Sequence, residues 1–265
     1  MYKVSKNIKI FSLALVVIGA LGLAFSFYSA PKTIEQAKEM VSEFINKDRL
    51  EIIGCVKYDQ FIRTVDNLEN IRRNVNSSIG HSNMFTILLA PSFGVDLSGM
   101  LKMFENVTYD FTKIRFIISP HPLVSFNSIM EIISLFSIKV KFDFFPEFST
   151  QDLAISADLV VCGYSSLAIE ALIFETPSIR IIRDEQIPLF ENEDSIMYIE
   201  NKDKFWKYID SCFDSSNIKN SKEDITKLIS FYLFKIDGNA KDRMWSFLKK
   251  IQNTNNKGIE KNEKS

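Results

Sequence analysis

The sequence predicts an α/β protein in which one domain is built on a parallel sheet, is followed by C-terminal helices and is preceded by one transmembrane helix. Three observations lead to this fold class. An uncharged apolar run lies near the N-terminus, short apolar runs alternate with helical stretches through the middle, and helical periodicity alone continues into the last third. The 265 residues suffice for one large domain or two small ones.

The composition is that of a folded protein without a strong overall charge. Apolar residues make up 46% of the chain and charged residues 25%, which excludes disorder throughout. The 32 basic and 33 acidic residues give a net charge of -1, so we expect no nucleic-acid partner. The 3 cysteines are widely spaced and only 2 histidines are present, so we expect neither a disulfide scaffold nor a metal site.

Residues 10–31 form an apolar run without a charge, and residues 1–31 are therefore predicted to be a membrane anchor. A helix over this run would be roughly 33 Å long, enough to cross the bilayer core. A cleaved signal peptide is the alternative, because lysines precede the run. The run is longer than the apolar core of a signal peptide, and Pro31 would follow the cleavage site, which favours the anchor.

The segment 32–50 is rich in glutamate and lysine and is predicted to be an amphipathic stalk, because its apolar residues recur at helical spacing. Positive charges lie on both sides of the apolar run, so they do not decide its orientation in the membrane.

Residues 51–252 are predicted to form the α/β domain. Strands are expected over 85–90, 114–119, 139–142, 158–162 and 178–182, with helices over about 96–106, 125–136 and 164–174. This alternation is typical of a Rossmann-like parallel sheet with crossover helices. The last third switches to helices with apolar stripes, each expected to face the core. These stripes are Phe205, Ile209, Cys212 and Phe213; Ile225, Leu228, Ile229 and Tyr232; and Ala240, Met244, Phe247, Leu248 and Ile251. Residues 253–265 are expected to be a disordered polar tail.

Polar or small residues follow three of the expected strands. In a parallel sheet, ligands bind at the carboxyl ends of the strands, so these residues are candidates for an anion site. They are Ser92 and Gly94 after the first strand, His121 and Pro122 after the second, and Gly163, Tyr164, Ser165 and Ser166 after the fourth.

The third of these segments carries the strongest signal. Gly163 permits a tight turn, and the hydroxyls of Ser165 and Ser166 with the following amides can bind phosphate oxygens. Glu170, one helical turn further, is then placed to reach a ribose. The alternative is that one serine is only an N-cap and that Glu170 is solvated on the outer face.

His121 lies between two prolines, which restrict its backbone and project the imidazole from the edge of the sheet. It can donate to a phosphate or assist its departure. The alternative is a surface histidine without a partner. No catalytic base is identified, although Asp96 and Asp184 lie near expected strand ends.

The order and spacing of the segments 114–122, 157–166 and 170–177 resemble the C-terminal, donor-binding half of a GT-B glycosyltransferase. The His-Pro and Ser-Ser pairs resemble motifs of bacterial sialyltransferases, Kdo transferases and related surface-carbohydrate biosynthesis proteins. Segments 53–59 and 234–243 are similar to the opening and closing parts of that half. The chain departs from the pattern at Ser119, where many relatives have a basic residue, and at Glu175, where many have glycine.

The resemblance implies roles for the candidate residues. His121, Pro122 and the segment 163–166 would contact the phosphate of a CMP-sugar or similar donor, with Ser92, Gly94 and Glu170 near the ribose or phosphate. It implies neither a metal nor another cofactor.

The implied function is a membrane-anchored, glycosyltransferase-like domain that binds a nucleotide-sugar in surface polysaccharide biosynthesis. In GT-B enzymes the N-terminal domain usually supplies acceptor contacts and the base; here residues 1–50 occupy that place, so a partner chain would supply them. Whether the chain is an enzyme therefore stays open. The alternatives are a non-catalytic nucleotide-binding or scaffold module, and a truncated or fused gene product.

Two further expectations concern the membrane. Because nucleotide-sugars are expected in the cytoplasm, the domain is expected on the cytoplasmic side of the inner membrane, tethered by a single span. The segment 29–35 with the preceding run resembles the N-terminal anchor of a small subunit of bacterial quinol:cytochrome c oxidoreductases. A CxxCH motif is absent, so no haem function follows.

Overall fold

The computed structural model describes residues 39, 51–80, 84–92, 94–163, 165–181, 196–214, 225–227 and 236–262. The chain divides into two units, Met1–Ile52 and Ile53–Ser265. The sheet and the helices described below belong to the second unit. The predicted anchor over 1–31 and nearly all of the predicted stalk over 32–50 lie outside the described residues. Across the ranges just given, the structure contains no helix of the length and apolarity needed to cross a membrane.

Within the described residues, a single sheet of 6 strands forms the centre of the domain, in the order β3-β2-β1-β4-β5-β6. Every neighbouring pair is parallel. The strands are β1 (Phe85–Ala90), β2 (Ile114–Ile118), β3 (Phe142–Asp143), β4 (Leu159–Cys162), β5 (Ser178–Ile181) and β6 (Met197–Ile199). The predicted Rossmann-like parallel sheet is confirmed.

The edge strands differ most from the prediction. Strand β3 pairs with β2 only through Phe142 and Asp143, whereas the sequence predicts a strand over 139–142. Apolar residues alternate with lysines before Phe142 as the prediction requires, but the backbone of residues 139–141 does not pair with β2. Strand β6 was not predicted, because its three residues are too few for a clear pattern and Met197 is exposed.

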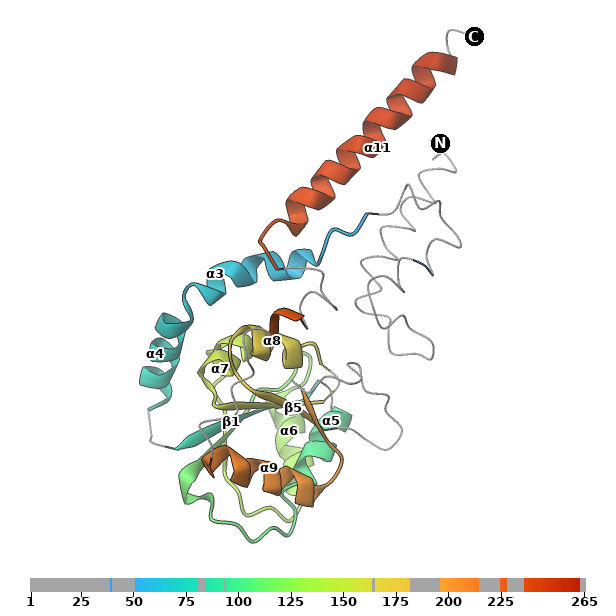
Figure 1. Ribbon diagram of the computed structural model, residues 1–265. Helices are drawn as coiled ribbons and strands as arrows, with labels where there is room; N and C mark the ends of the chain where they lie inside the picture. Colours follow the sequence, from blue (N-terminus) through green and yellow to red (C-terminus); the bar gives the residue numbers. More distant parts are fainter. Residues whose placement is uncertain are drawn as a thin grey trace. The chain divides into compact units, whose positions relative to one another are not determined.

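Helices cover both faces of the sheet (Figure 1). Helices α5 (Gly94–Leu101), α6 (Phe126–Ser134) and α9 (Lys202–Asp214) lie on one face, and α7 (Thr150–Ser156) and α8 (Leu167–Ile173) lie on the other. Helix α4 (Leu68–Ile79) packs against α7 on this second face. Alternate residues of β1 explain the two layers: Ile87 and Leu89 enter the core of the first face, and Leu88 enters that of the second.

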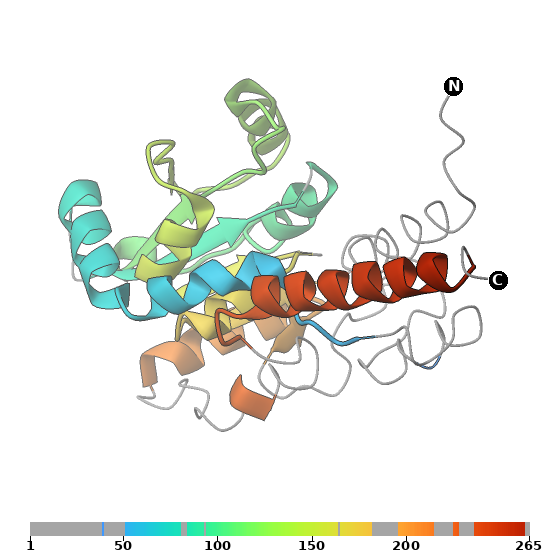
Figure 2. The same cartoon turned by 90° about the horizontal axis from the view of Figure 1, so that it is seen from above.

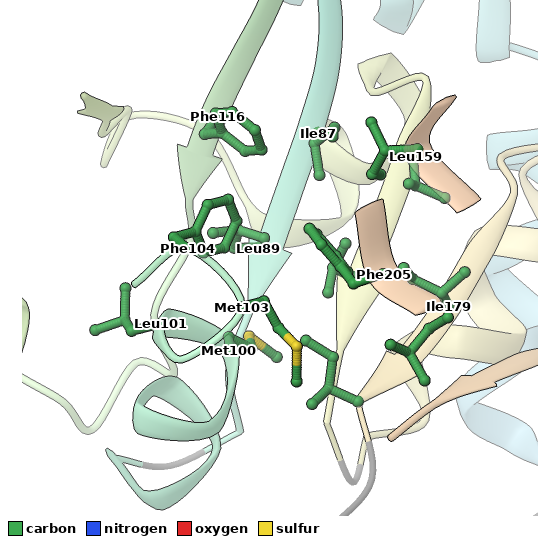
Figure 3. Packing of buried hydrophobic residues seen from close by; sticks show 14 of the residues in the cluster. Ile87, Leu89, Met100, Leu101, Met103, Phe104, Phe116, Leu159, Ile179 and Phe205 are labelled. Atoms are coloured by element: carbon green, nitrogen blue, oxygen red, sulfur yellow. The ribbon is translucent and has the colours of Figure 1, made fainter. Parts of the chain in front are cut away.

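Aromatic side chains fill the core beneath α5, α6 and α9 (Figure 3). Phe104 is 1% exposed, and its ring centroid lies 5.0 Å from that of Phe116 and 5.6 Å from that of Phe205. Both contacts are edge-on, the arrangement that aromatic rings favour. The predicted stripe on α9 enters this core through Phe205, Ile209 and Cys212, but Phe213 is 43% exposed and does not.

The beginning and the end of the domain meet (Figure 2). The turn η2 (Val56–Gln60), followed by α3 (Phe61–Val65), lies beside the start of α11 (Ala240–Asn262). Asp59 accepts hydrogen bonds from the backbone N–H groups of Ala240 and Lys241 at 3.0 and 2.8 Å. Arg243 Nε donates to the carbonyl oxygen of Ile53 at 2.8 Å. The segments that open and close this domain are therefore joined by polar contacts.

Helix α11 runs further than expected. The sequence places its apolar stripe over 240–251 and predicts a disordered tail over 253–265, whereas the helix continues to Asn262. No proline interrupts this segment; asparagine and glycine are weaker helix formers than lysine and glutamate, but none of them ends a helix as proline does. The second predicted stripe begins at Ile225 and ends at Tyr232. Residues 225–227 are described and are helical, and the rest of this stripe lies outside the described residues.

Candidate functional site

The carboxyl ends of β2, β1 and β4 lie next to one another at one edge of the sheet, because β1 pairs in parallel with both of the others. The β1 loop (91–94), the β2 loop (119–122) and the β4 loop (163–166) begin at this edge. The structure describes all of them except residues 93 and 164. Neighbouring strands are about 4.8 Å apart, so the β2 and β4 loops begin about 10 Å from each other.

The strand order reverses at the same place. From β1 the chain proceeds outward to β2 and β3, and from β4 it proceeds the other way to β5 and β6. Ligands of open α/β sheets bind outside the carboxyl ends of the strands at such a switch point. The segments that the sequence selects therefore begin at the position where this architecture accepts a ligand.

Arg180 of β5 holds the β4 loop. Its side chain is buried, and it donates from Nε to the carbonyl oxygen of Gly163 at 2.9 Å and from Nη2 to that of Ser165 at 3.1 Å. The N–H of Ser165 donates to the same Gly163 oxygen at 3.0 Å and closes a tight turn. Arg180 is not among the predicted site residues, although an arginine within an expected buried strand is a signal visible in the sequence.

The two serines have different roles. Ser165 Oγ accepts from the N–H of Leu167 at 3.2 Å and so satisfies a backbone group at the start of α8. Ser166 occupies the N-cap position but makes no capping bond; its Oγ donates to Glu170 Oε1 at 2.8 Å. Ser166 is therefore the N-cap residue by position but lacks the capping bond that the alternative supposes, and Ser165 binds the first N–H of α8 from one residue earlier.

Glu170 is 2% exposed, so the alternative of a solvated carboxylate is wrong. Lys57 Nζ lies 2.5 Å from Oε1, and Gln151 Nε2 donates to Oε2 at 3.2 Å. With the bond from Ser166, both carboxylate oxygens accept hydrogen bonds from the protein. A buried charge requires such compensation. In this structure Glu170 faces the protein's own donors.

Lys57 and Tyr58 bring η2 to this cluster. Lys57 Nζ also lies 3.4 Å from Ser166 Oγ and 5.5 Å from the centre of the Tyr58 ring. Burial and the neighbouring Glu170 raise the pKa of the Tyr58 hydroxyl, which therefore stays neutral at physiological pH. Lys57 is not among the predicted site residues, because no local pattern joins it to a carboxylate 113 positions away.

His121 is half-buried at the start of its turn. Its Nδ1 accepts from the N–H of Leu123 at 3.2 Å, and its carbonyl oxygen accepts from the N–H of Val124 at 2.8 Å. The alternative of a histidine without a partner is therefore wrong. Because Nδ1 is an acceptor, the neutral ring carries its hydrogen on Nε2.

The other predicted residues are less defined. Ser92 is half-buried directly after Pro91, Gly94 begins α5, and Pro122 is exposed. Asp96 lies within α5, while Tyr164 and Asp184 lie outside the described residues. In the part of the chain that is described, no 3 histidine, cysteine or acidic side chains are grouped in a way that could hold a metal.

No family model and no curated protein matches the sequence. Solved structures do match. The chain is similar to the UDP-GlcNAc 2-epimerase from Methanocaldococcus jannaschii, with a TM-score of 0.55 and 17% identity over 84% of this chain and 62% of that one. It is also similar to a variant of the wall teichoic acid polymerase TagF soaked with CDPG, with a TM-score of 0.51 and 12% identity over 96% of this chain and 63% of that one.

These likenesses show the fold. The chain has the fold of a GT-B half, as predicted. It spans less than two thirds of the length of each neighbour. The narrower resemblance to sialyltransferases and Kdo transferases, and that of residues 1–50 to an oxidoreductase anchor, stay predictions.

Proposed function

We propose that this domain binds a nucleotide-sugar through its phosphate at the carboxyl edge of β2, β1 and β4. The observation that carries the proposal is the reversal of strand order between β1 and β4, with the polar β1, β2 and β4 loops starting on that edge. The name of one neighbour agrees with this ligand class, since it is an epimerase of UDP-GlcNAc.

The contacts of the site suggest which atoms would bind the phosphate. A hydroxyl both accepts and donates, and Ser165 Oγ accepts from Leu167. Within the described part of the chain no acceptor takes its hydrogen, which is the one we assign to a phosphate oxygen. The hydrogen of Ser166 is directed at Glu170 instead. His121 would donate from Nε2, because its Nδ1 is engaged by the backbone. We therefore assign direct roles to Ser165 and His121, and a positioning role to Ser166.

The test is thermal unfolding of the full chain with CMP, CDP, UDP and GDP. A nucleotide at a hundredfold excess over its dissociation constant stabilises the folded state by about 2.7 kcal/mol. We expect one nucleotide to raise the Tm and Ser165→Ala to reduce the effect. His121→Asn keeps an acceptor for the Leu123 N–H but removes Nε2, and should reduce it as well. Ser77→Ala, which alters an exposed serine of α4, is the control. If no nucleotide shifts the Tm, the proposal is wrong.

We further propose that the bound donor is used for glycosyl transfer in surface polysaccharide biosynthesis, with a CMP-sugar as the first candidate and a partner chain supplying the acceptor site. Donor hydrolysis, followed by transfer in the presence of membranes, tests this step. Nucleotide binding without turnover in either assay would favour the non-catalytic module instead.

We also propose that residues 10–31 anchor the domain to the inner membrane with the domain in the cytoplasm, where nucleotide-sugars are expected. Removal of residues 10–31 should move the protein from the membrane to the soluble fraction. Protease added to the outside of spheroplasts should leave the domain intact. Cleavage there would place it on the wrong side for such a donor.

A further inference from the structure

We propose that Lys57 is a phosphate-binding residue whose ammonium group moves from Glu170 to the phosphate of the bound nucleotide. This inference rests on the proposed function and names a residue of the same site that neither the motifs nor the resemblance selects. Lys57 Nζ lies 3.4 Å from Ser166 Oγ, which places a cation at the β4 loop although Lys57 comes from a different part of the chain.

The exposure of the ion pair is unequal. The side chain of Lys57 is 48% exposed, whereas that of Glu170 is 3% exposed. The carboxylate is thus enclosed, while the ammonium group stands between it and solvent. A ligand that approaches the β4 loop from solvent meets Lys57 and not Glu170.

The hydrogen bonds permit the exchange. An ammonium group has three donors, and the contacts in the described part of the chain direct Nζ at Glu170 and Ser166. A phosphate oxygen can take the remaining hydrogen or replace the carboxylate. If Lys57 turns away, Glu170 keeps the bonds from Ser166 and Gln151, so both of its oxygens still have a hydrogen-bond donor.

The charge at the β4 loop must come from side chains. Helix α8 has 7 residues, and so short a helix contributes little dipole at its N-terminus. Arg180 is positive, but its Nε and Nη2 donate to the carbonyl oxygens of Gly163 and Ser165 beneath the loop. Among the described side chains at this loop, Lys57 therefore provides an exposed positive charge, and charge-assisted hydrogen bonds are the ones that hold phosphate most strongly.

The backbone that carries Lys57 is fixed, so only its side chain has to move. The next residue, Tyr58, is 6% exposed, and its ring packs edge-on against Phe61 with centroids 5.0 Å apart. Asp59 binds the first turn of α11 through two N–H groups. A fixed backbone with a movable cation favours a binding role, because little order has to be created when the ligand arrives.

The test compares Lys57→Gln with the double variant Lys57→Gln/Glu170→Gln in the full chain. The single variant leaves a buried carboxylate without its cation and can lower stability, whereas the double variant replaces the ion pair by two neutral amides of similar shape. The probes are the nucleotide selected by the thermal panel, its nucleoside, which lacks the phosphate, and inorganic pyrophosphate.

We expect both variants to bind the nucleotide and pyrophosphate about tenfold or more weakly than the wild type, with nucleoside binding unchanged. Lys113→Gln is the matched control. Lys113 lies directly before β2 and hence at the opposite edge of the sheet, so this variant should bind as the wild type does. If the double variant keeps wild-type affinity, Lys57 is only a structural partner of Glu170 and the inference is wrong. If no nucleotide stabilises the wild type, the proposed function fails and takes this inference with it.

Discussion

Arg180 Nε donates to the carbonyl oxygen of Gly163 at 2.9 Å, so a strand of the sheet directly supports the backbone of the neighbouring loop. Arg180 is 2% exposed and also binds the carbonyl oxygen of Ser165 at 3.1 Å. A planar guanidinium suits two acceptors at a fixed spacing. The conformation of the β4 loop therefore depends on a residue that a ligand does not need to touch.

Replacing Arg180 by methionine should destabilise the protein by about 3 kcal/mol, because two buried carbonyl oxygens lose charge-assisted hydrogen bonds. Arg180→Lys should cost less, since an ammonium group can keep one of the two. Urea denaturation measures both, and an unchanged m-value would show that the effect is one of stability. Arg73→Met, at an exposed site on α4, should stay within about 0.5 kcal/mol of the wild type. If Arg180→Met and Arg73→Met lowered the free energy of unfolding equally, the result would contradict the role of Arg180 in supporting the β4 loop.

Glu175 ends helix α8 in a conformation that suits glycine. Its φ is 63°. The N–H of Thr176 donates to Ala171 O at 2.9 Å and that of Glu175 to Leu172 O at 3.0 Å, which is the Schellman pattern. A side chain in this left-handed region costs about 1 to 2 kcal/mol, partly offset by the greater entropy of glycine in the unfolded chain. We therefore expect Glu175→Gly to raise the free energy of unfolding by about 1 kcal/mol.

Glu175→Ala separates the backbone effect from loss of the carboxylate, because alanine keeps the Cβ atom. It should give no gain. Glu147 lies in an exposed turn and has no positive φ. Glu147→Gly should therefore be destabilising, because glycine relieves no strain there and only raises the conformational entropy of the unfolded chain. A gain from alanine equal to that from glycine would show that the side chain, and not the backbone, is responsible.

Strands β1, β2 and β4 could be predicted because buried parallel strands are largely apolar runs, and β5 could be predicted because Pro177 precedes it, although Ser178 and Arg180 interrupt its apolar pattern. Helix α7 was missed, although Ser149 and Asp152 form a capping box that marks its start in the sequence. The β4 loop could be predicted from its glycine and serines. The bonds from Lys57 and Gln151 to Glu170 could not, since such pairings arise only when the sheet brings distant segments together.

The contact of Asp59 with α11 gives a prediction for the C-terminal helix. Asp59→Ala removes the acceptor for the N–H groups of Ala240 and Lys241 and should destabilise the protein by about 1 kcal/mol. Hydrogen exchange at these two amides should accelerate, which separates the loss of a cap from a general loss of stability. Asp59→Asn keeps an oxygen acceptor and should recover part of the effect. Asp66→Ala, at an exposed site, is the control. If the amides of Ala240 and Lys241 exchanged faster in this variant as well, the result would speak against a specific cap.

Stability should fall at alkaline pH. Burial raises the pKa of Cys212 to about 12 and raises that of the Tyr208 hydroxyl, and Tyr58 is shifted in the same direction. In the unfolded chain these groups lose protons near their ordinary values of about 8.5 for cysteine and 10 for tyrosine. Above those values the folded state holds more protons than the unfolded state, so the free energy of unfolding decreases as pH rises.

Cys212→Ala isolates one of these groups. Below about pH 8.5 the Cys212 thiol is protonated in both states of the wild type, so the difference in unfolding free energy between wild type and variant should be constant. Between about pH 9 and 10.5 the wild type should lose about 2 kcal/mol relative to the variant, at 1.4 kcal/mol per pH unit. Urea denaturation at pH 7, 8, 9.5 and 10.5 measures the difference. A value that stays constant to pH 10.5 would mean that the thiol titrates alike in both states and is not desolvated in the folded protein.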